Sequence, residues 1–358
     1  MTQKIAILTG GGDAPGLNAV IRAVVLAARE HYGWQVVGIR EGFDGLLEDK
    51  PLIDLTSMDV HDLLARGGTI LGAASRGNPF GRPVENADGT ITHVDRSQEA
   101  LDKLRQHQID ALICAGGDGT MAIAYKLVQK GAHIVGVPKT IDNDLGETDV
   151  TFGFDTAVNT ATDALEKLRT TAESHHRIMV MEVMGRNAGW IALTSGIAGG
   201  ADAILIPEIP FDLDMVCAKI ETLRDAGRMY SLIVVAEGAH PKDGTQVYHI
   251  GGQDDGRLGG IGHQVGARLA ECAGSEVRVT VLGHVQRGGQ PTPHDRYLAT
   301  LFGTEAVHSV AEARWGTMVA MKRGNITVVP MAEAVQMKFV DPDGEIVRAA
   351  RDLGIVFG

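Results

Sequence analysis

Two segments of this sequence, 116–120 and 138–144, hold the residue types best suited to chemistry on a phosphate group. The first reads Gly-Gly-Asp-Gly-Thr and the second reads Pro-Lys-Thr-Ile-Asp-Asn-Asp. Small residues let backbone amides approach a phosphate, carboxylates hold magnesium or accept a proton, and a lysine neutralises negative charge. The two segments therefore indicate phosphoryl transfer as the first hypothesis.

Each segment follows an apolar run that is expected to form a β-strand, at 109–115 and at 134–137. A helix-like run to Gln129 separates the two strands and has the length of a single crossover. Strands joined in this way are parallel and adjacent, so their carboxyl ends meet at one edge of a sheet. Ligands bind at that edge in open α/β sheets, which favours one site built from both segments.

A third segment, 10–18, is rich in glycine and lies between the apolar run 5–9 and a helix expected at 19–29. Glycines that precede a helix can form a phosphate cradle from backbone amides. The segment matches neither the GxGxxG fingerprint nor a Walker loop with its Lys-Ser/Thr ending, which disfavours the two commonest nucleotide-binding motifs. A purely structural turn remains the alternative.

The segment 67–77 is composed mainly of small residues and carries Arg76 near its end. A guanidinium group there can make paired hydrogen bonds to a phosphate, although a solvated loop arginine is the alternative. The next stretch, 79–92, contains Pro, Gly, Asn and Asp and is expected to form a hairpin or a surface loop.

Length and charge limit the class of protein. A chain of 358 residues is long enough for about two domains. A formal net charge of -12 argues against nonspecific binding of nucleic acid, which requires a basic surface. An anionic ligand would therefore need a local positive site.

The three cysteines, Cys114, Cys217 and Cys272, are scattered and lack CxxC spacing. Scattered cysteines argue against a zinc site, a disulfide framework and an oxidising compartment. We therefore expect all three cysteines to be small core residues. The first residues lead directly into a strand, without a targeting segment, and no run reaches membrane-spanning length. The expected location is the cytoplasm, without a membrane partner.

Strand-like and helix-like runs alternate along nearly the whole chain. Later strands are expected at 178–183, 203–207, 232–236 and 277–282, and a final hairpin is expected around Gly324. This alternation predicts an α/β fold with parallel sheets covered by helices. Because the pattern occurs before and after about residue 150, we expect two domains with a cleft between them.

Five motifs in sequence order resemble the 6-phosphofructokinase family: 11–18, 116–120, 138–144, 184–186 and 284–289. The motif at 116–120 also occurs in NAD kinases and diacylglycerol-type lipid kinases, whereas all five together are specific.

The resemblance implies two Rossmann-like three-layer domains with mainly parallel sheets and an active site in the cleft between them. It assigns residues 1–153 plus 286–337 to a nucleotide or phosphoryl-donor domain. Residues 154–285 plus 338–358 would then form a sugar-phosphate domain.

The family phosphorylates the 1-hydroxyl of fructose 6-phosphate, so the resemblance implies a glycolytic kinase that uses Mg²⁺ and ATP. Asp142 is then the base that accepts the hydroxyl proton, and Asp118 holds the metal. The other residues implied in catalysis are Gly12, Arg76, Thr140 and Arg186. The residues implied in nucleotide binding are Gly12, Ser75, Arg76, Gly117, Asp118, Gly119 and Thr120.

The resemblance also implies a set of residues that bind the sugar phosphate: Thr140, Asp142, Arg177, Met184, Gly185, Arg186, Glu237, Arg278, His284 and Arg287. Arg177 and Arg278 match arginines that reach the 6-phosphate from a neighbouring subunit. We therefore expect a homodimer or homotetramer with shared active sites. The loop before Arg76 is one residue longer than the commonest form in the family, which leaves the position of Arg76 open.

Two positions give opposite indications about the phosphoryl donor, a mixed ATP and pyrophosphate signature. Members that use pyrophosphate generally carry Asp at the position of Gly119, where a carboxylate would repel the α-phosphate of ATP. They usually carry Lys at the position of Lys139, where typical ATP users have Gly. A repulsive group discriminates more strongly than an added attractive one, so we expect ATP, with pyrophosphate as the alternative.

Two other interpretations remain. A kinase of NAD or of a lipid does not account for the segments 140–144 and 284–289. A non-catalytic sugar-phosphate sensor is disfavoured by the joint presence of Asp118, Asp142 and Asp144.

Overall fold

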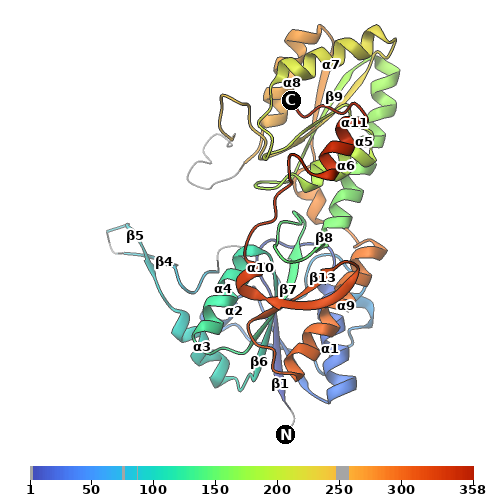
Figure 1. The fold of residues 1–358 in the computed structure, drawn as a ribbon. Coiled ribbons are helices and arrows are strands. Elements are labelled where there is room, and N and C mark those ends of the chain that lie inside the picture. The colour runs from blue at the N-terminus through green and yellow to red at the C-terminus, as the bar shows by residue number, and fades with distance from the viewer. Residues whose placement is uncertain (1–2, 75–76, 87, 247–257) are drawn as a thin grey trace. The chain divides into compact units, whose positions relative to one another are not determined.

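The computed structural model describes residues 3–74, 77–86, 88–246 and 258–358, and the chain divides into two compact units (Figure 1). The first unit comprises Met1–Ile141, Leu145–Asp155 and Arg287–Met337. The second comprises Asp142–Asp144, Thr156–Gln286 and Lys338–Gly358. The segment Asp142–Asp144, which the expected division places with residues 1–153, therefore groups with the second unit.

The first unit is built on a sheet whose strand order is β14-β13-β7-β6-β1-β2-β3, with β8 paired to β7. The strands are β1 (Lys4–Thr9), β2 (Gln35–Ile39), β3 (Ile53–Asp54), β6 (Ala111–Gly116), β7 (Ile134–Thr140), β8 (Phe152–Gly153), β13 (Thr317–Lys322) and β14 (Asn325–Pro330). Its helices are α1 (Leu17–Leu26), α2 (Asp44–Leu47), α3 (Ser97–Gln106), α4 (Asp118–Gln129), α9 (Pro293–Ala311) and α10 (Met331–Ala334), with short turns of other helix types at Ala27–His31 and His61–Leu63.

The pairing of β6 with β7 confirms the parallel, adjacent arrangement expected from a single crossover. Leu112 lies opposite Ile134, and both strands are buried along their length. Among the described strands of this sheet, the edge strands β3 and β14 alone run antiparallel to their neighbours. The segments 116–120 and 138–144, at the ends of β6 and β7, therefore begin at the same edge of this sheet.

Helices cover both faces of the first sheet, which gives three layers. Ile5 and Ile7 of β1 pack in one cluster with residues of α1 and α9, such as Val20 and Phe302. The alternate residues Ala6 and Leu8 pack in another cluster with side chains of α3 and α4. Successive strand residues point to opposite faces, so the apolar run of β1 supplies both cores.

The second unit contains a parallel sheet of order β10-β11-β9-β12. Its strands are β9 (Ile178–Val183), β10 (Ala203–Leu205), β11 (Ser231–Ala236) and β12 (Val277–Val281). Its helices are α5 (Phe154–His175), α6 (Trp190–Ala198), α7 (Leu213–Asp225), α8 (Ile261–Ala273) and α11 (Glu345–Asp352), and a short helix η3 covers Gly283–Arg287. Both α5 and η3 extend by one or two residues into the first unit.

The two faces of this second sheet carry different helices. Val216 of α7 and Val265 of α8 pack in one cluster with Ala203 and Leu205 of β10. Ile204, between these two strand residues, instead approaches Gly196 of α6, where an added Cβ would lie 2.6 Å from its side chain. The mixed α/β fold with mainly parallel sheets is therefore confirmed.

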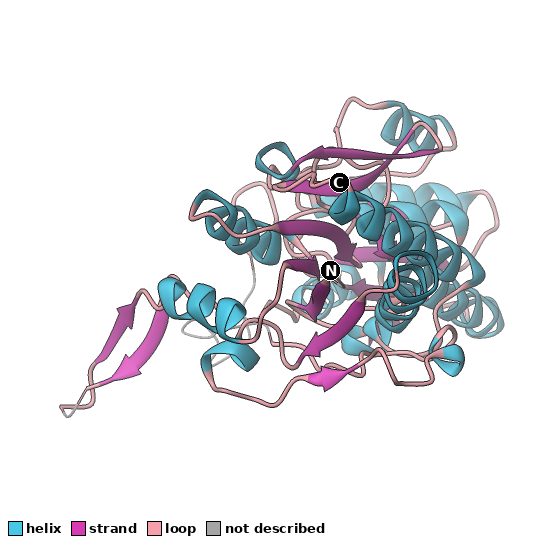
Figure 2. Ribbon diagram, turned by 90° about the horizontal axis from the view of Figure 1, so that it is seen from below, coloured by secondary structure: helices cyan, strands magenta, loops and turns pink. Residues whose placement is uncertain are grey.

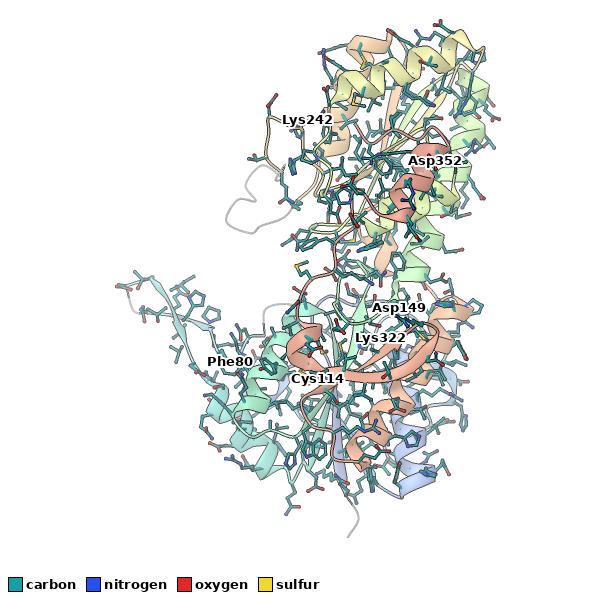
Figure 3. All side chains as sticks on the ribbon, in the orientation of Figure 1. Phe80, Cys114, Asp149, Lys242, Lys322 and Asp352 are labelled. Atoms are coloured by element: carbon teal, nitrogen blue, oxygen red, sulfur yellow. A yellow bond between two sulfur atoms is a disulfide. The ribbon has the colours of Figure 1, made fainter. Side chains whose placement is uncertain are left out.

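Two hairpins occur in the first unit, in the regions where the sequence predicts them. Strands β4 (Arg82–Glu85) and β5 (Ile91–Val94) form an antiparallel pair, which Figure 2 shows extending away from the sheet. Strands β13 and β14 turn at Gly324, whose φ is +77°. Near this turn the backbone amide of Met321 donates to Thr148 Oγ1 at 3.0 Å, and Figure 3 shows Lys322 close to Asp149. The hairpin thus supports the segment that follows Asp144.

The expectation that the cysteines form no disulfide is wrong for one pair. Cys217 in α7 and Cys272 in α8 are joined by a disulfide, with their Cα atoms 6.2 Å apart. These helices pack side by side on one face of the sheet, so residues 55 positions apart meet, which a search for CxxC spacing does not detect. Cys114 is free and buried in β6, as expected for a core residue (Figure 3). Within the described ranges, each helix is too short or too polar to span a bilayer.

Candidate active site

The glycine-rich turn after β1 lines a cavity of about 400 Å³ in the first unit. Gly11, Gly12 and Asp13 form one wall, and Thr69 and Ala73 form the other. Gly11 has a φ of +75°, a conformation that side-chain-bearing residues rarely adopt. The two glycines therefore present backbone rather than side chains to this cavity, as a phosphate cradle requires.

The side chain of Thr120 packs against glycines at the ends of β1 and β6. A Cβ added at Gly10 would lie 2.6 Å from Thr120 Oγ1, and one at Gly116 would lie 2.3 Å from Thr120 Cβ. Thr120 is 6% exposed, so both glycines are needed to seat this side chain. The structure thus gives Thr120 a packing role, in addition to the nucleotide contact implied by the resemblance.

Asp118 and Gly119 form the exposed first turn of α4, next to the end of β6. A Cβ added at Gly119 would meet no described atom within 4 Å. The helix N-terminus favours a bound anion here, and the Asp118 carboxylate faces solvent next to it. The space that ATP would need near Gly119 is therefore not filled by the described protein atoms.

A metal at Asp118 would have to rely largely on other ligands. Among the residues that the structure describes, no three His, Cys, Asp or Glu side chains come together as a metal site. Mg²⁺ typically takes one or two protein carboxylates, several waters and substrate phosphates. A single exposed carboxylate beside a phosphate cradle fits that ion better than it fits calcium or zinc.

Lys139, next to last in β7, points at the glycine-rich turn. Its side chain is 3% exposed, and its ammonium group donates a 2.5 Å hydrogen bond to the carbonyl of Gly12. A Cβ at Gly11 would lie 3.4 Å from the same nitrogen. The segments 10–18 and 138–144, far apart in sequence, therefore meet through this lysine.

Arg287 reaches the same turn from the end of η3. Its Nη1 donates to the carbonyl of Asp13 at 3.3 Å, and a Cβ at Gly12 would lie 2.9 Å from that nitrogen. The resemblance implies separate roles for Gly12 and Arg287, in donor binding and sugar binding respectively. The structure places them next to each other, so that two positively charged side chains, those of Lys139 and Arg287, lie near Gly12.

The segment that leads to Arg76 runs beside this turn. Thr9 Oγ1 donates to the carbonyl of Gly72 at 2.7 Å, and the amide of Gly11 donates to the carbonyl of Ala74 at 3.2 Å. Ser75 and Arg76, both expected in the site, lie outside the described residues.

The segment 140–144 continues from β7. Thr140 is 8% exposed, and its carbonyl accepts a 2.7 Å hydrogen bond from Thr151 Oγ1. A Cβ at Gly117 would lie 3.8 Å from that of Thr140, so the ends of β6 and β7 are close. Asp142 is half-buried, and the next residue, Asn143, has a left-handed φ of +52°. The left-handed residue therefore directly follows the expected base, beyond the end of β7.

The second unit holds a smaller cavity, of about 100 Å³, at the carboxyl ends of β9, β11 and β12. Three residues expected to bind the sugar phosphate line it: Met184, Glu237 and His284. The cavity is also lined by residues that sequence reasoning did not select: Glu182, Val183, Leu258, Gly259, Val281 and Gly283. The structure therefore brings together residues from three of the predicted strand ends.

Backbone contacts hold Glu237 against the segment 184–186. The amide of Glu237 donates to the carbonyl of Val183 at 2.8 Å, and that of Gly238 donates to Gly185 at 3.1 Å. A Cβ at Gly238 would lie 1.9 Å from the carbonyl oxygen of Arg186, so only glycine fits there. The Arg186 side chain itself is exposed.

Gln286 is a further supporting residue that sequence reasoning did not assign a role. It is fully buried, and its Oε1 accepts a 2.8 Å hydrogen bond from the amide of Met184. Its position between His284 and Arg287, within the motif 284–289, is the sequence feature that could have identified it. Gln286 therefore fixes the backbone of a residue that lines the cavity.

Arg177 and Arg278, expected to bind a phosphate in a neighbouring subunit, share one carboxylate. Glu276 accepts a 2.5 Å hydrogen bond from Arg177 Nε and also pairs with Arg278. The hydrogen bond from Arg177 lowers the pKa of Glu276 below its ordinary value. The two arginines thus lie together at the amino-terminal ends of β9 and β12.

Comparison with known proteins identifies the family. The family described as Phosphofructokinase matches residues 4–310. The chain belongs to the phosphofructokinase family. An ATP-dependent 6-phosphofructokinase of Chloroflexus aggregans is 52% identical over 357 residues, which cover 99% of this chain and 98% of that protein.

Relatives of both donor types occur in this family. A pyrophosphate--fructose 6-phosphate 1-phosphotransferase of Amycolatopsis methanolica is 49% identical, over 95% of this chain and 97% of that protein. The solved phosphofructokinase of Saccharomyces cerevisiae superimposes with a TM-score of 0.78 at 35% identity, over 93% of this chain and 45% of that one. Membership of the phosphofructokinase family therefore leaves the donor to be decided, and the roles of Gly119 and Lys139 in donor choice need separate tests.

Proposed function

We propose that this chain transfers the γ-phosphoryl group of Mg-ATP to the 1-hydroxyl of fructose 6-phosphate, giving fructose 1,6-bisphosphate as a glycolytic kinase. The near-full-length identity to a relative named ATP-dependent 6-phosphofructokinase supports the activity. The observation that carries the choice of donor is the open space at Gly119, where the described atoms leave room next to the start of α4.

We propose that the donor binds to the first unit. Gly12, Gly117, Gly119 and Thr120 would surround its phosphates, and Ser75 and Arg76 would add contacts from their loop. Backbone amides at the glycine turn and at the start of α4 supply hydrogen bonds without bulky side chains. Mg²⁺, held by Asp118, would supply charge neutralisation on the transferred group when bound.

We propose that Asp142 accepts the proton of the 1-hydroxyl as that oxygen attacks the γ-phosphorus. The new O–P bond forms as the bond between the γ-phosphorus and the bridging oxygen of ADP breaks. A half-buried carboxylate at a strand end needs only hydrogen-bond reach of the hydroxyl for this role. Thr140, Arg186 and Arg76 would position the reacting groups and balance the charge that shifts to the leaving oxygen.

The sugar phosphate would bind through residues of the second unit and Arg287. Met184, Gly185 and Arg186 lie on one connection, with Glu237 held beside it. Glu237 would accept hydrogen bonds from sugar hydroxyls, while His284 and Arg287 would contact the sugar and its 6-phosphate. The shared cavity of Met184, Glu237 and His284 supports this grouping.

We also propose a homodimer or homotetramer in which Arg177 and Arg278 reach the 6-phosphate bound to a neighbouring subunit. The pairing of both arginines with Glu276 supports a joint role for them. Sedimentation velocity would test the assembly, and a monomer that retains full activity would contradict the shared site.

In domain terms, residues 1–153 plus 286–337 would serve the phosphoryl donor, and 154–285 plus 338–358 the sugar phosphate. We propose a cytoplasmic location, where these metabolites are made and used. The state of the Cys217–Cys272 pair in cells tests that location, because reducing compartments keep most thiols reduced. Thiol alkylation in intact cells would report the state of Cys217 and Cys272.

Pyrophosphate-dependent transfer is the second candidate, and the buried Lys139 beside Gly12 is the observation that favours it. Steady-state kinetics with ATP and pyrophosphate at the same fructose 6-phosphate concentration separates the two. We expect turnover with Mg-ATP and much lower efficiency with pyrophosphate. Equal or greater turnover with pyrophosphate would overturn the donor assignment.

The same assay should include NAD and diacylglycerol as acceptors, since the motif at 116–120 is shared with their kinases. Fructose 6-phosphate should be the preferred acceptor. Binding of fructose 6-phosphate without turnover by either donor would instead support a non-catalytic sensor.

A further inference from the structure

A buried carboxylate, that of Glu182, links the cavity of the second unit to the start of α8. Glu182 is next to last in β9 and is 2% exposed. Its Oε1 accepts a 3.2 Å hydrogen bond from the amide of Gly260, and its Oε2 accepts one of 2.8 Å from Gly262. A charged group is costly to bury without such partners, so both bonds matter for keeping it there.

The neighbouring backbone is shaped around this carboxylate. Gly262 is the second residue of α8, and the amides of a first helical turn lack partners within the helix. Gly260, which precedes the helix, has a left-handed φ of +91° and provides no side-chain cap. A Cβ at Gly262 would lie 2.9 Å from Glu182 Oε2, so glycine permits the contact. Glu182 therefore caps α8 from a different element, where negative charge is favoured.

The capped segment forms one wall of the cavity. Leu258 and Gly259 come directly before Gly260 and line the cavity together with Met184, Glu237 and His284. A second wall is held by backbone contact, since the amide of Leu282 donates to the carbonyl of Glu182 at 3.0 Å. Glu182 thus contacts both walls of the cavity. Its side chain holds the segment that leads into α8, and its main-chain carbonyl holds the segment at Leu282.

We propose that Glu182 is a positioning residue that sets the affinity for the sugar phosphate, by holding Leu258 and Gly259 against the strand ends that carry Met184, Glu237 and His284. This inference rests on the proposed function, in which the last three residues bind the sugar. Glu182 acts through the cavity wall in the second unit. Its loss should therefore weaken binding of the sugar and leave the donor cradle of the first unit unchanged.

The test is a pair of variants that disturb the contact in different ways. Glu182→Gln keeps the shape but removes the charge and one acceptor, and we expect the KM for fructose 6-phosphate to rise about tenfold. The KM for ATP and kcat should stay within about twofold of the wild-type values. Gly262→Ala retains the carboxylate but pushes it away, and should raise the same KM. Glu221→Gln, an exposed glutamate on α7, is the matched control and should change nothing.

Calorimetric titration of fructose 6-phosphate, alongside the kinetics, distinguishes failure of this inference from failure of the proposed function. Wild-type sugar affinity in both variants, in a wild-type enzyme that phosphorylates the sugar, would overturn the positioning role. A parallel rise in the KM values for sugar and ATP, with a lowered melting temperature, would also overturn it, because that result indicates general destabilisation. Weakened sugar binding in the variants supports the role even if turnover is absent. A wild-type protein that neither binds nor phosphorylates the sugar overturns the proposed function and this role with it.

Discussion

The ammonium group of Lys139 donates a 2.5 Å hydrogen bond to the carbonyl oxygen of Gly12, which fixes a buried positive charge at the glycine-rich turn. We expect Lys139→Met to raise the KM for the phosphoryl donor about tenfold, because a charge-assisted hydrogen bond at the donor cradle is lost. The KM for fructose 6-phosphate should change little. Lys167→Met, at an exposed lysine of α5, controls for removal of a positive charge. Equal donor KM values in the two variants would contradict a role for Lys139 in donor binding.

Gly119 allows a clean test of donor choice, because an added Cβ meets no described atom within 4 Å. We expect Gly119→Asp to lower kcat/KM for ATP by about 10- to 100-fold through repulsion of the nucleotide phosphates, with sugar affinity retained. Gly119→Ala is the control for the loss of glycine and should stay close to wild type. If the alanine and aspartate variants behave alike, charge repulsion is not the cause.

Asp142 should affect the chemical step rather than binding. We expect Asp142→Asn to reduce kcat by about 10²- to 10⁴-fold, the usual contribution of general acid–base catalysis, with a small change in the KM for fructose 6-phosphate. Asp163→Asn on α5 provides an exposed aspartate as control. Asp142→Ser should behave like the asparagine variant, and near-normal turnover in either would show that the base is another group.

The disulfide between Cys217 and Cys272 closes a long stretch of chain between α7 and α8. Cross-links of this kind stabilise by about 2–4 kcal/mol, mainly by restricting the unfolded chain. We expect Cys217→Ser to lower the melting temperature by several degrees in the absence of reductant. The matched control is the wild-type protein with dithiothreitol, which should melt like the variant. A wild-type melting temperature that does not respond to reductant would count against the bond in solution.

Glu208 should make stability depend on pH. Burial raises the pKa of this carboxyl above its ordinary value of 4.5, although the amides of Gly189 and Val340 donate to it at 3.0 and 2.9 Å. The folded protein then binds the proton more tightly than the unfolded chain does, so this contribution is present below the ordinary value and is lost as pH rises through the raised one.

Urea unfolding at several pH values from about 4 to 8 would measure this effect. We expect the free energy of unfolding of the wild type to include a component that falls with rising pH, and Glu208→Gln to lack it. Glu221→Gln should keep the wild-type slope. The same slope in Glu208→Gln would assign the pH dependence to other groups.

The pairing of β6 with β7 was predictable, because both strands are apolar and a single helix joins them. Their order within a sheet that also contains β13 and β14 was not, since those strands arrive from the end of the chain. The same distinction holds for the site. Met184, Glu237 and His284 were expected from the family resemblance, whereas Glu182 and Gln286 act through hydrogen bonds to distant backbone groups.

The chemistry available to this protein can be predicted from local sequence: glycine turns at strand ends, the carboxylates of Asp118 and Asp142, and the alternation that produces parallel sheets. Local spacing is enough for these features, because each depends on residues within one strand, turn and helix. The folded structure was needed to show that Lys139 and Arg287 both contact the turn at Gly12 and Asp13, and that Cys217 and Cys272 are joined. Such contacts arise from how separate elements pack, and residue spacing along the chain carries little information about them.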